Sequence, residues 1–249
     1  MCRHLLYLGR PVTLSALLLD PPHSLLKQSW APTQMRGGGT INADGFGAGW
    51  YADGPPVRYR RNCPIWTDEN FARLAAATSS GAVLAAVRSA TVGMPVAESA
   101  SAPFTADRWL FSLNGRVADW PDSMIKLAET VPVRDLLTLD APSDAALVWA
   151  LVQHRLRAGA TPAEAVAEVT AAVAAAAPDS RLNLLLTDGV TGVATTLVHS
   201  LWVRQGAGAV ALASEPYDTD PRWQAVPDGQ LVTVTASTVD TSALPIEMG

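Results

Sequence analysis

Short apolar runs, each closed by turn-forming residues, dominate the hydrophobic pattern of the first half of the chain. Such runs are typical of buried strands, and they cover residues 2–8, 45–51, 82–89 and 109–113. Residues 57–61 are a further strand candidate, and Asp53-Gly54-Pro55-Pro56 predicts the turn of a hairpin between 45–51 and 57–61. Helical spacing of apolar residues occurs at 68–78.

The middle of the chain changes to helical periodicity with clear start signals. Ser143 is a good N-cap for a helix whose apolar stripe includes residues 147–152. Thr161 and Glu164 have the spacing of a capping box, with Pro162 at the first helical position, so a second helix is expected to end near Pro178. The short connection between the two predicts a helical hairpin.

The last part of the chain returns to short apolar runs. Residues 182–186, 194–203, 209–213 and 230–235 are read as four strands, and residues 242–249 are expected to be frayed. Strands, then a helical pair, then more strands without a long linker fit a single α+β domain over residues 2–249. Its expected form is two mainly antiparallel sheets packed face to face, with helices outside.

Composition and charge narrow the class of protein. A hydrophobic share of 49% excludes a disordered chain, and 18 basic against 23 acidic residues, a net charge of −5, argue against nucleic-acid binding. No apolar run approaches the ~18 residues that a membrane span needs, and no secretion signal is recognised, so a cytosolic protein is expected. Scattered histidines and the lack of a phosphate-binding loop predict neither a metal nor a cofactor.

Cys2 is the first candidate for chemistry. If Met1 is removed, the thiol and a free α-amine belong to one residue. A terminal amine has a pKa of about 7.7–8.0, so it accepts a proton near neutral pH and can activate the adjacent thiol. The alternative is that Cys2 is a small buried hydrophobic residue, as free cysteines usually are.

Asn114-Gly115 follows the apolar run at 109–113 directly. A side-chain amide and a neighbouring backbone N–H at a strand end can together stabilise the oxyanion of a tetrahedral intermediate. The same dipeptide is the commonest in tight turns, so on its own it favours a hairpin turn.

Three further features carry charge or flexibility. Arg88 ends a buried run, where its guanidinium either grips a substrate carboxylate or forms a structural ion pair. Asp144 opens the Ser143 helix, where it either binds an ammonium group or stabilises the helix terminus. The segment 42–47 follows three glycines at 37–39 and is either a substrate-gating loop or a flexible connection.

Taken in order, these features resemble one known family. The features are Cys2 behind Met1, Asp44-Gly45-Phe46-Gly47, Arg88-Ser89-Ala90-Thr91, Asn114-Gly115 after a strand, and Ser143-Asp144 opening a helix. They are similar to the class II glutamine amidotransferase domain of the N-terminal-nucleophile hydrolases. In detail, MCRHLLYLG, INADGFGAGWY, VRSATVGMP, LNLLLTDG and ALASEPYD resemble the amidohydrolases of ergothioneine biosynthesis, to about residue 234.

The resemblance implies a four-layer αββα sandwich and a role for each matching residue. It implies that Cys2 is the nucleophile with its α-amine as base, and that the Asn114 side chain and the Gly115 N–H stabilise the oxyanion. Arg88 would bind the glutamyl α-carboxylate and Asp144 the α-ammonium. Further pocket residues implied by the resemblance are Thr91, Asn42 and Gly47.

The implied reaction is hydrolysis of a γ-glutamyl amide, releasing glutamate from γ-glutamyl-hercynylcysteine S-oxide, without a cofactor, nucleic acid, membrane or obligate protein partner. A glutaminase subunit of a two-protein amidotransferase and a non-catalytic binding module are the alternatives. Leu113 stands where many relatives have histidine. Candidate aromatic contacts for the trimethylammonium of the leaving group are Trp30, Tyr51, Trp66 and Trp120.

Overall fold

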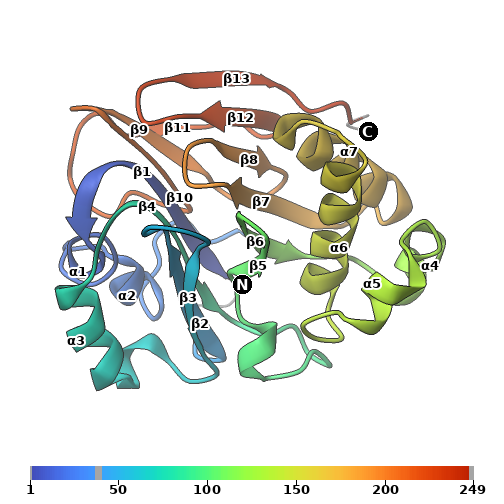
Figure 1. The fold of residues 1–249 in the computed structure, drawn as a ribbon, viewed down its shortest axis with the longest axis horizontal. Coiled ribbons are helices and arrows are strands. Elements are labelled where there is room, and N and C mark those ends of the chain that lie inside the picture. Colours follow the sequence, from blue (N-terminus) through green and yellow to red (C-terminus); the bar gives the residue numbers. More distant parts are fainter. Residues whose placement is uncertain (1, 37–40, 247–249) are drawn as a thin grey trace.

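The computed structural model describes residues 2–36 and 41–246, which form two antiparallel sheets (Figure 1). In spatial order, the first sheet contains β11 (Gln224–Ala225), β9 (Trp202–Gly206), β10 (Ala209–Ala213), β1 (Arg3–Thr13), β4 (Ser79–Arg88), β2 (Gly45–Trp50) and β3 (Val57–Arg61). The second contains β13 (Val239–Ala243), β12 (Gln230–Val234), β8 (Gly192–Thr196), β7 (Arg181–Thr187), β6 (Trp109–Arg116) and β5 (Phe104–Ala106).

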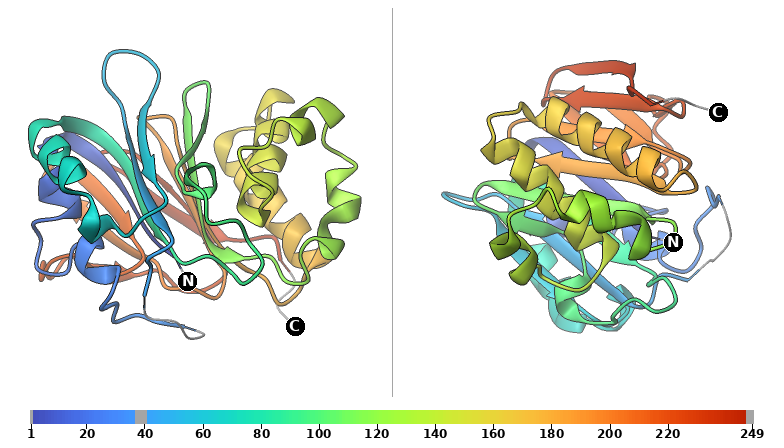
Figure 2. Two further views of the ribbon diagram at one scale, coloured as in Figure 1. Left: turned by 90° about the horizontal axis from the view of Figure 1, so that it is seen from below. Right: turned by 90° about the vertical axis from the view of Figure 1, so that its right-hand side faces the viewer.

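Helices cover the outer face of each sheet, as Figure 2 shows in its left-hand view. The first sheet is covered by α1 (Leu14–Leu18), α2 (Leu25–Gln28) and α3 (Glu69–Ala77). The second is covered by α6 (Asp144–Arg157) and α7 (Pro162–Ala176), with the short α4 (Ile125–Ala128) and α5 (Val133–Leu137) beside them. The expected four-layer αββα sandwich of the α+β class is confirmed.

The period-two pattern of β1 explains why two sheets form. Leu5 and Tyr7 pack under the outer helices, whereas Leu6 and Leu8 belong to the apolar cluster between the sheets. Because successive side chains of a strand point to opposite faces, a strand that is apolar at every position is buried on both.

The space between the sheets changes from apolar to polar along its length. On β1, the inward positions run from Leu8 and Leu6 to buried His4, and then to Cys2 just before the strand. On β6 the corresponding sequence is Leu110, Ser112 and Asn114, all fully buried. Polar groups of both sheets therefore meet at one end of the inter-sheet space.

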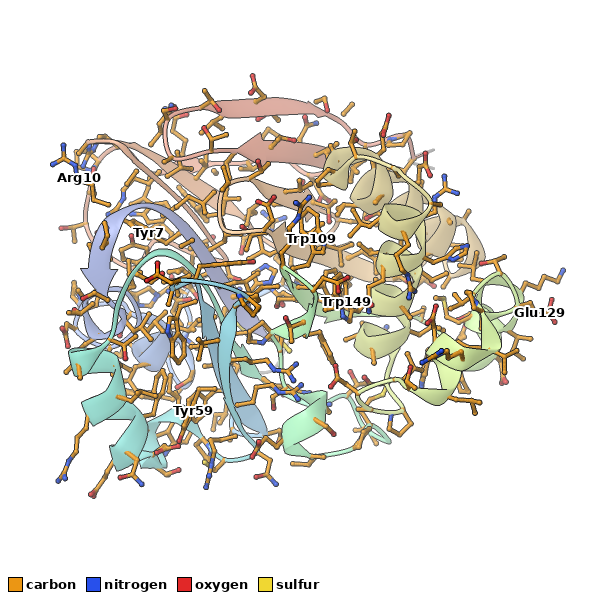
Figure 3. The ribbon with its side chains drawn as sticks, viewed as in Figure 1. Tyr7, Arg10, Tyr59, Trp109, Glu129 and Trp149 are labelled. Atoms are coloured by element: carbon orange, nitrogen blue, oxygen red, sulfur yellow. The ribbon has the colours of Figure 1, made fainter. Side chains whose placement is uncertain are left out.

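The outer layer of the second sheet follows from local signals in the sequence. The Ser143 side chain accepts a hydrogen bond from the Ala146 N–H at the start of α6, and Thr161 and Glu164 form a capping box at the start of α7, as predicted. Trp149 of α6 points toward the sheet (Figure 3), where its ring stacks on Phe111 with the ring centroids 5.1 Å apart.

One predicted strand is wrong. Residues 194–203 are not continuous: β8 ends at Thr196 in the second sheet, and β9 begins at Trp202 in the first. Val198 has φ +80°, which ends extended pairing, and the Asn183 side-chain oxygen accepts from the Leu197 and His199 N–H groups. The intervening residues carry the chain from one sheet to the other.

The prediction of a frayed end over residues 242–249 is wrong for residues 242–244. Ser242 and Ala243 pair with β12 inside β13, and Leu244 is buried, with its N–H donating to the carbonyl of Gly229. The apolar side chain of Leu244 is buried and holds this segment in place. The strand was not predicted because its residues do not show the period-two alternation of apolar and polar side chains.

Several expectations fall outside what the structure describes. Removal of Met1, the glycines at 37–39 and the end of the chain at 247–249 lie outside the described residues. A single domain over 2–249 stays a prediction. Within residues 2–36 and 41–246, no helix is long and apolar enough to cross a bilayer.

The glycines of β2 allow a close contact between the sheets. Phe46, Ala48 and Trp50 are buried under the outer helices, whereas the glycines alternate toward the other side. A Cβ atom at Gly47 would lie 2.4 Å from the Ala102 carbonyl oxygen and 3.0 Å from that of Tyr59. These oxygens are backbone atoms, so they cannot turn away as a side chain can.

Replacement of Gly47 by alanine should therefore lower the free energy of unfolding by about 2 kcal/mol or more, because the added methyl group overpacks against backbone. Gly54→Ala is a control for backbone strain alone: it has φ +117° but no atom within 4 Å of the added Cβ, so any loss there comes from the backbone and not from overpacking. Urea unfolding monitored by tryptophan fluorescence measures both variants. An unchanged free energy of unfolding for Gly47→Ala would contradict the proposed close contact.

Candidate active site

A cavity opens where the polar ends of the two sheets meet the start of α6. Its lining includes four residues that the sequence singled out: Cys2, Arg88, Gly115 and Asp144. Thr91 also lines it. Further lining residues, not predicted, are Ala86, Val87, Ser89, Ala90, Met94, Ala100, Ala102, Phe104, Leu113, Ser143 and Ala145. The start of β1, the end of β4, β6 and the start of α6 thus converge on one space.

Strand pairing places Cys2 in this cavity. Arg3 is the first residue of β1 and pairs with Val87 of β4, which puts Cys2 beside the end of β4. The thiol is partly buried, and its Sγ lies 3.9 Å from the carbonyl oxygen of Ser89.

Asn114 and Gly115 continue β6 instead of forming the tight turn that the dipeptide alone would allow. They pair with Asn183 and Leu182 of β7. A Cβ at Gly115 would lie 1.7 Å from the Arg181 carbonyl oxygen, so only glycine fits there. Gly115 lines the cavity, whereas Asn114 lies just behind it, fully buried.

Arg88 ends β4 on the face that points between the sheets. Its Nη1 donates to the Pro95 carbonyl oxygen at 2.8 Å, so it closes the segment 88–95. Asp44 fastens the start of that segment: its N–H donates to the Arg88 carbonyl at 3.0 Å, and its carboxylate accepts from the Ala90 N–H at 2.8 Å. Thr91 follows within the same segment.

Asp144 lies across the cavity from this segment, at the first turn of α6. Its carboxylate accepts from the Val117 N–H at 2.9 Å and the Ala145 N–H at 2.8 Å. Burial raises the pKa of Asp144, and these backbone hydrogen bonds and the charge of Arg88 only partly oppose that effect. A cation bound in the cavity would therefore stabilise the ionised form.

Two predicted pocket residues are not at the cavity. Asn42 is buried, and its N–H donates to the Ser29 carbonyl at 2.7 Å. Gly47 packs against Ala102, so it reaches the cavity only through that neighbour. The described residues that line the cavity include neither.

The four aromatic candidates for the leaving group are likewise absent from the described lining. Trp30 and Trp66 pack edge to face, with ring centroids 5.6 Å apart. The Tyr51 hydroxyl lies 2.8 Å from the carbonyl oxygens of both Arg108 and Thr187, and its one proton can be donated to either. Trp120 packs against the cluster under α6 and α7.

Two buried histidines behind the site are neutral. Burial, with the charge of Arg3 adding to it, lowers the pKa of both His4 and His199 to about 3. No histidine is among the described residues that line the cavity. A base for chemistry at Cys2 therefore has to come from another group.

A buried carboxylate, which the sequence reading missed, supports the start of β1. Glu215 is fully buried and lies 3.8 Å from the Arg3 Nε, itself fully buried. Its other carboxylate oxygen accepts from the Thr33 hydroxyl at 2.6 Å, from the Thr33 and Gln34 N–H groups, and interacts with His23 Nε2 at 2.9 Å. Glu215 thus ties the segment at 33–34 to the residue next to Cys2.

These contacts determine how Glu215 titrates. Burial alone would raise the pKa of Glu215, but hydrogen bonds from Thr33 and His23 and the charge of Arg3 outweigh burial and lower it. A carboxyl whose pKa is lower in the folded state stabilises the fold above its unfolded value of about 4.3. That contribution disappears as the pH falls through the folded pKa.

Glu215→Gln should accordingly lower the free energy of unfolding by about 3 kcal/mol at pH 7, because it removes the carboxylate charge that faces the buried Arg3 guanidinium. The difference from the unmodified chain should shrink below about pH 4. Urea unfolding of the variant and of the unmodified chain, at pH 7 and below about pH 4, measures this difference. Glu129→Gln, at an exposed position beyond α4 (Figure 3), is the control and should change nothing; a pH-independent loss would contradict the titration.

Comparison with known proteins shows the family to which the chain belongs. Residues 14–205 match the family model described as glutamine amidotransferases class-II. A gamma-glutamyl-hercynylcysteine sulfoxide hydrolase from Mycolicibacterium smegmatis is 45% identical, over 94% of this chain and 96% of that protein. One of the same name from Mycobacterium tuberculosis is 42% identical, over 98% and 97% respectively.

Solved structures share the fold. A class-II glutamine aminotransferase domain protein from Silicibacter pomeroyi has a TM-score of 0.66 at 23% identity, over 98% of this chain and 99% of that one. The glutamine phosphoribosylpyrophosphate amidotransferase of B. subtilis has a TM-score of 0.69 at 12% identity, over 99% of this chain and 50% of that one. The family model, which matches most of the chain, and the relatives at 42–45% identity establish that the chain belongs to the class II glutamine amidotransferase family, and the solved structures share its N-terminal-nucleophile hydrolase fold.

Proposed function

We propose that this protein is a thiol amidohydrolase that cleaves the γ-glutamyl amide of γ-glutamyl-hercynylcysteine S-oxide, giving glutamate and hercynylcysteine S-oxide. The observation that carries the proposal is the presence of Cys2, Arg88, Gly115 and Asp144 around one cavity. The names of the two relatives at 42–45% identity support the choice of substrate. Activity in the cytosol without a partner protein is part of the proposal.

Arg88 and Asp144 are suited to the two charges of a glutamyl head. Their charges are opposite, and the charge of Arg88 partly opposes the rise that burial causes in the pKa of Asp144. In the proposed complex, Arg88 binds the α-carboxylate in a charge-assisted hydrogen bond, and Asp144 binds the α-ammonium. Two opposite charges on one α-carbon fix its stereochemistry and direct the γ-carbonyl toward Cys2.

The proposed chemistry begins with the free N-terminus that removal of Met1 would create. The Cys2 sulfur attacks the γ-carbonyl carbon while the α-amine takes the thiol proton. Asn114 and the Gly115 N–H stabilise the oxyanion. The C–N bond then breaks, the amine passes its proton to the leaving nitrogen, and a γ-glutamyl thioester remains.

Water completes the cycle. The α-amine removes a proton from a water molecule, which attacks the thioester carbonyl carbon. The C–S bond breaks, glutamate leaves, and the proton returns to the Cys2 thiol. An amine with a pKa of about 7.7–8.0 is suited to both steps near neutral pH, and it fits a cavity whose described lining has no histidine.

The purified chain alone should release glutamate from the sulfoxide conjugate with a kcat/KM at least about 100-fold above that for L-glutamine, because the conjugate has a large leaving group that the protein can bind, whereas glutamine releases only ammonia. Cys2→Ala should lose about 10⁴-fold or more. An enzyme-coupled assay of glutamate release measures these rates. The intact mass of the protein shows whether Met1 has been removed. Faster turnover of L-glutamine would favour a glutaminase subunit, and no turnover of either would favour a binding module.

The role of Asp144 can be tested with two substrates. Asp144→Asn should lower kcat/KM for a γ-glutamyl amide by about 10- to 100-fold, since a charge-assisted contact with the ammonium is lost. For the glutaryl analogue, which lacks the α-amine, the same variant should lose much less. Equal losses with both substrates would show that Asp144 acts only on the structure of the α6 terminus.

A further inference from the structure

We propose that Ser214 is a positioning residue that orients the Asn114 amide for oxyanion stabilisation. This inference rests on the proposed function and extends it to a side chain outside the cavity lining. Ser214 directly follows β10, on the inward face that meets β6, and is fully buried. It lies 100 positions from Asn114 in the sequence, yet its Oγ accepts from the Asn114 Nδ2 at 3.1 Å.

The backbone of Ser214 is held on both sides. Its N–H donates to the His4 carbonyl oxygen at 3.0 Å, and its own carbonyl accepts from the Ser200 hydroxyl at 2.8 Å. A hydroxyl on a backbone fixed in this way has little freedom apart from rotation about χ1. Ser214 is therefore a rigid reference point for the groups that it contacts.

The hydrogen bonds of the Ser214 hydroxyl fix the direction of the Asn114 amide. Its oxygen accepts from the His4 N–H at 3.0 Å as well as from Asn114, and its own proton goes to the His4 carbonyl at 3.3 Å. With the proton used there, the oxygen faces Asn114 as an acceptor, so it binds the amide nitrogen and not the amide oxygen. One Nδ2–H is held, and the second is left for substrate.

Within residues 2–36 and 41–246, the Asn114 amide has no other hydrogen-bond partner. Its Oδ1 is buried without a hydrogen-bond partner there. Without Ser214, the amide could turn and point its oxygen at the developing oxyanion. The partial negative charge of the amide oxygen would then repel the oxyanion. The hydroxyl thus selects the rotamer that presents a donor.

The same hydroxyl also links the strand that follows the nucleophile to the strand that carries the oxyanion donor. His4 lies two residues after Cys2 on β1, in the first sheet, and Asn114 lies on β6, in the second. By binding the backbone of His4 and the side chain of Asn114, Ser214 sets the oxyanion donor relative to the strand that carries the nucleophile. A shift of this donor would affect the transition state more than the bound substrate.

Ser214→Ala should lower kcat for γ-glutamyl amide hydrolysis by about 10- to 100-fold and leave KM within about twofold, because the donor acts on the transition state. Ser112→Ala is the matched control: it removes a fully buried hydroxyl from β6 that contacts the His4 ring at 3.2 Å but not Asn114. Its kcat should stay within about twofold. Equal effects of the two variants would overturn the proposal.

A pair of isosteric variants removes the effect of packing. Ser214→Thr keeps the hydroxyl, and Ser214→Val has the same shape without it. Both add one methyl-sized group at a buried position, so a fault in folding should appear in both. The kcat of Ser214→Thr should stay within about fivefold of that of the unmodified protein. The kcat of Ser214→Val should fall about as far as that of Ser214→Ala. Similar kcat values for threonine and valine would overturn the proposal.

An inhibitor provides a readout that does not depend on turnover. With the γ-aldehyde of glutamate, the Cys2 thiol adds to the carbonyl, the S–C bond forms, and the oxygen takes the thiol proton where the oxyanion would lie. Ser214→Ala should weaken this adduct about 10- to 100-fold and leave L-glutamate binding unchanged. Unchanged aldehyde binding, or equal losses for both ligands, would overturn the role of Ser214.

Failure of the proposed function would be seen separately. If the unmodified protein cleaves neither the conjugate nor L-glutamine, or does not form the aldehyde adduct, the chemistry assigned to Cys2 is wrong. If it prefers L-glutamine, the proposed substrate is wrong. The kcat values of the Ser214 variants can then still be compared with L-glutamine as substrate, since both substrates place the same γ-carbonyl oxygen beside Asn114.

Discussion

The pairing of β1 on both of its edges is the constraint on which the site depends. β1 is hydrogen-bonded to β4 on one side and to β10 on the other, and its first residue already belongs to the ladder. A chain terminus usually frays because nothing holds its backbone. Here Cys2 directly precedes a central strand, so it is placed by the register of the sheet and not by a loop.

Buried polar groups are the cost of building a site between two sheets. At this end the leucines of the inter-sheet layer give way to His4, Ser112, Asn114 and Ser214, all of which are buried. Such groups are tolerated because they bind one another and the ends of strands. The charged pair of Arg3 and Glu215 follows the same rule. A network of this kind gives little net stability but permits few alternative arrangements.

Local features of this fold were readable from sequence, and long-range ones were not. The N-cap at Ser143 and the capping box of Thr161 and Glu164 act within one helical turn. Residue identity and spacing were therefore enough to predict where α6 and α7 begin. The cavity residues were identified through a family resemblance. Glu215 was missed because its Thr33 contact spans 182 positions, and the crossing at Val198 because a β-branched residue at positive φ has no sequence signature.

The hydrogen bond from Arg88 to the Pro95 carbonyl has a consequence for affinity. One N–H of the Arg88 guanidinium already binds a neutral acceptor, the Pro95 carbonyl oxygen, at 2.8 Å. This contact fixes the direction of the guanidinium, and its remaining N–H groups stay able to donate. In the proposed complex, a carboxylate would therefore meet donors that are already oriented, which lowers the conformational entropy lost on binding.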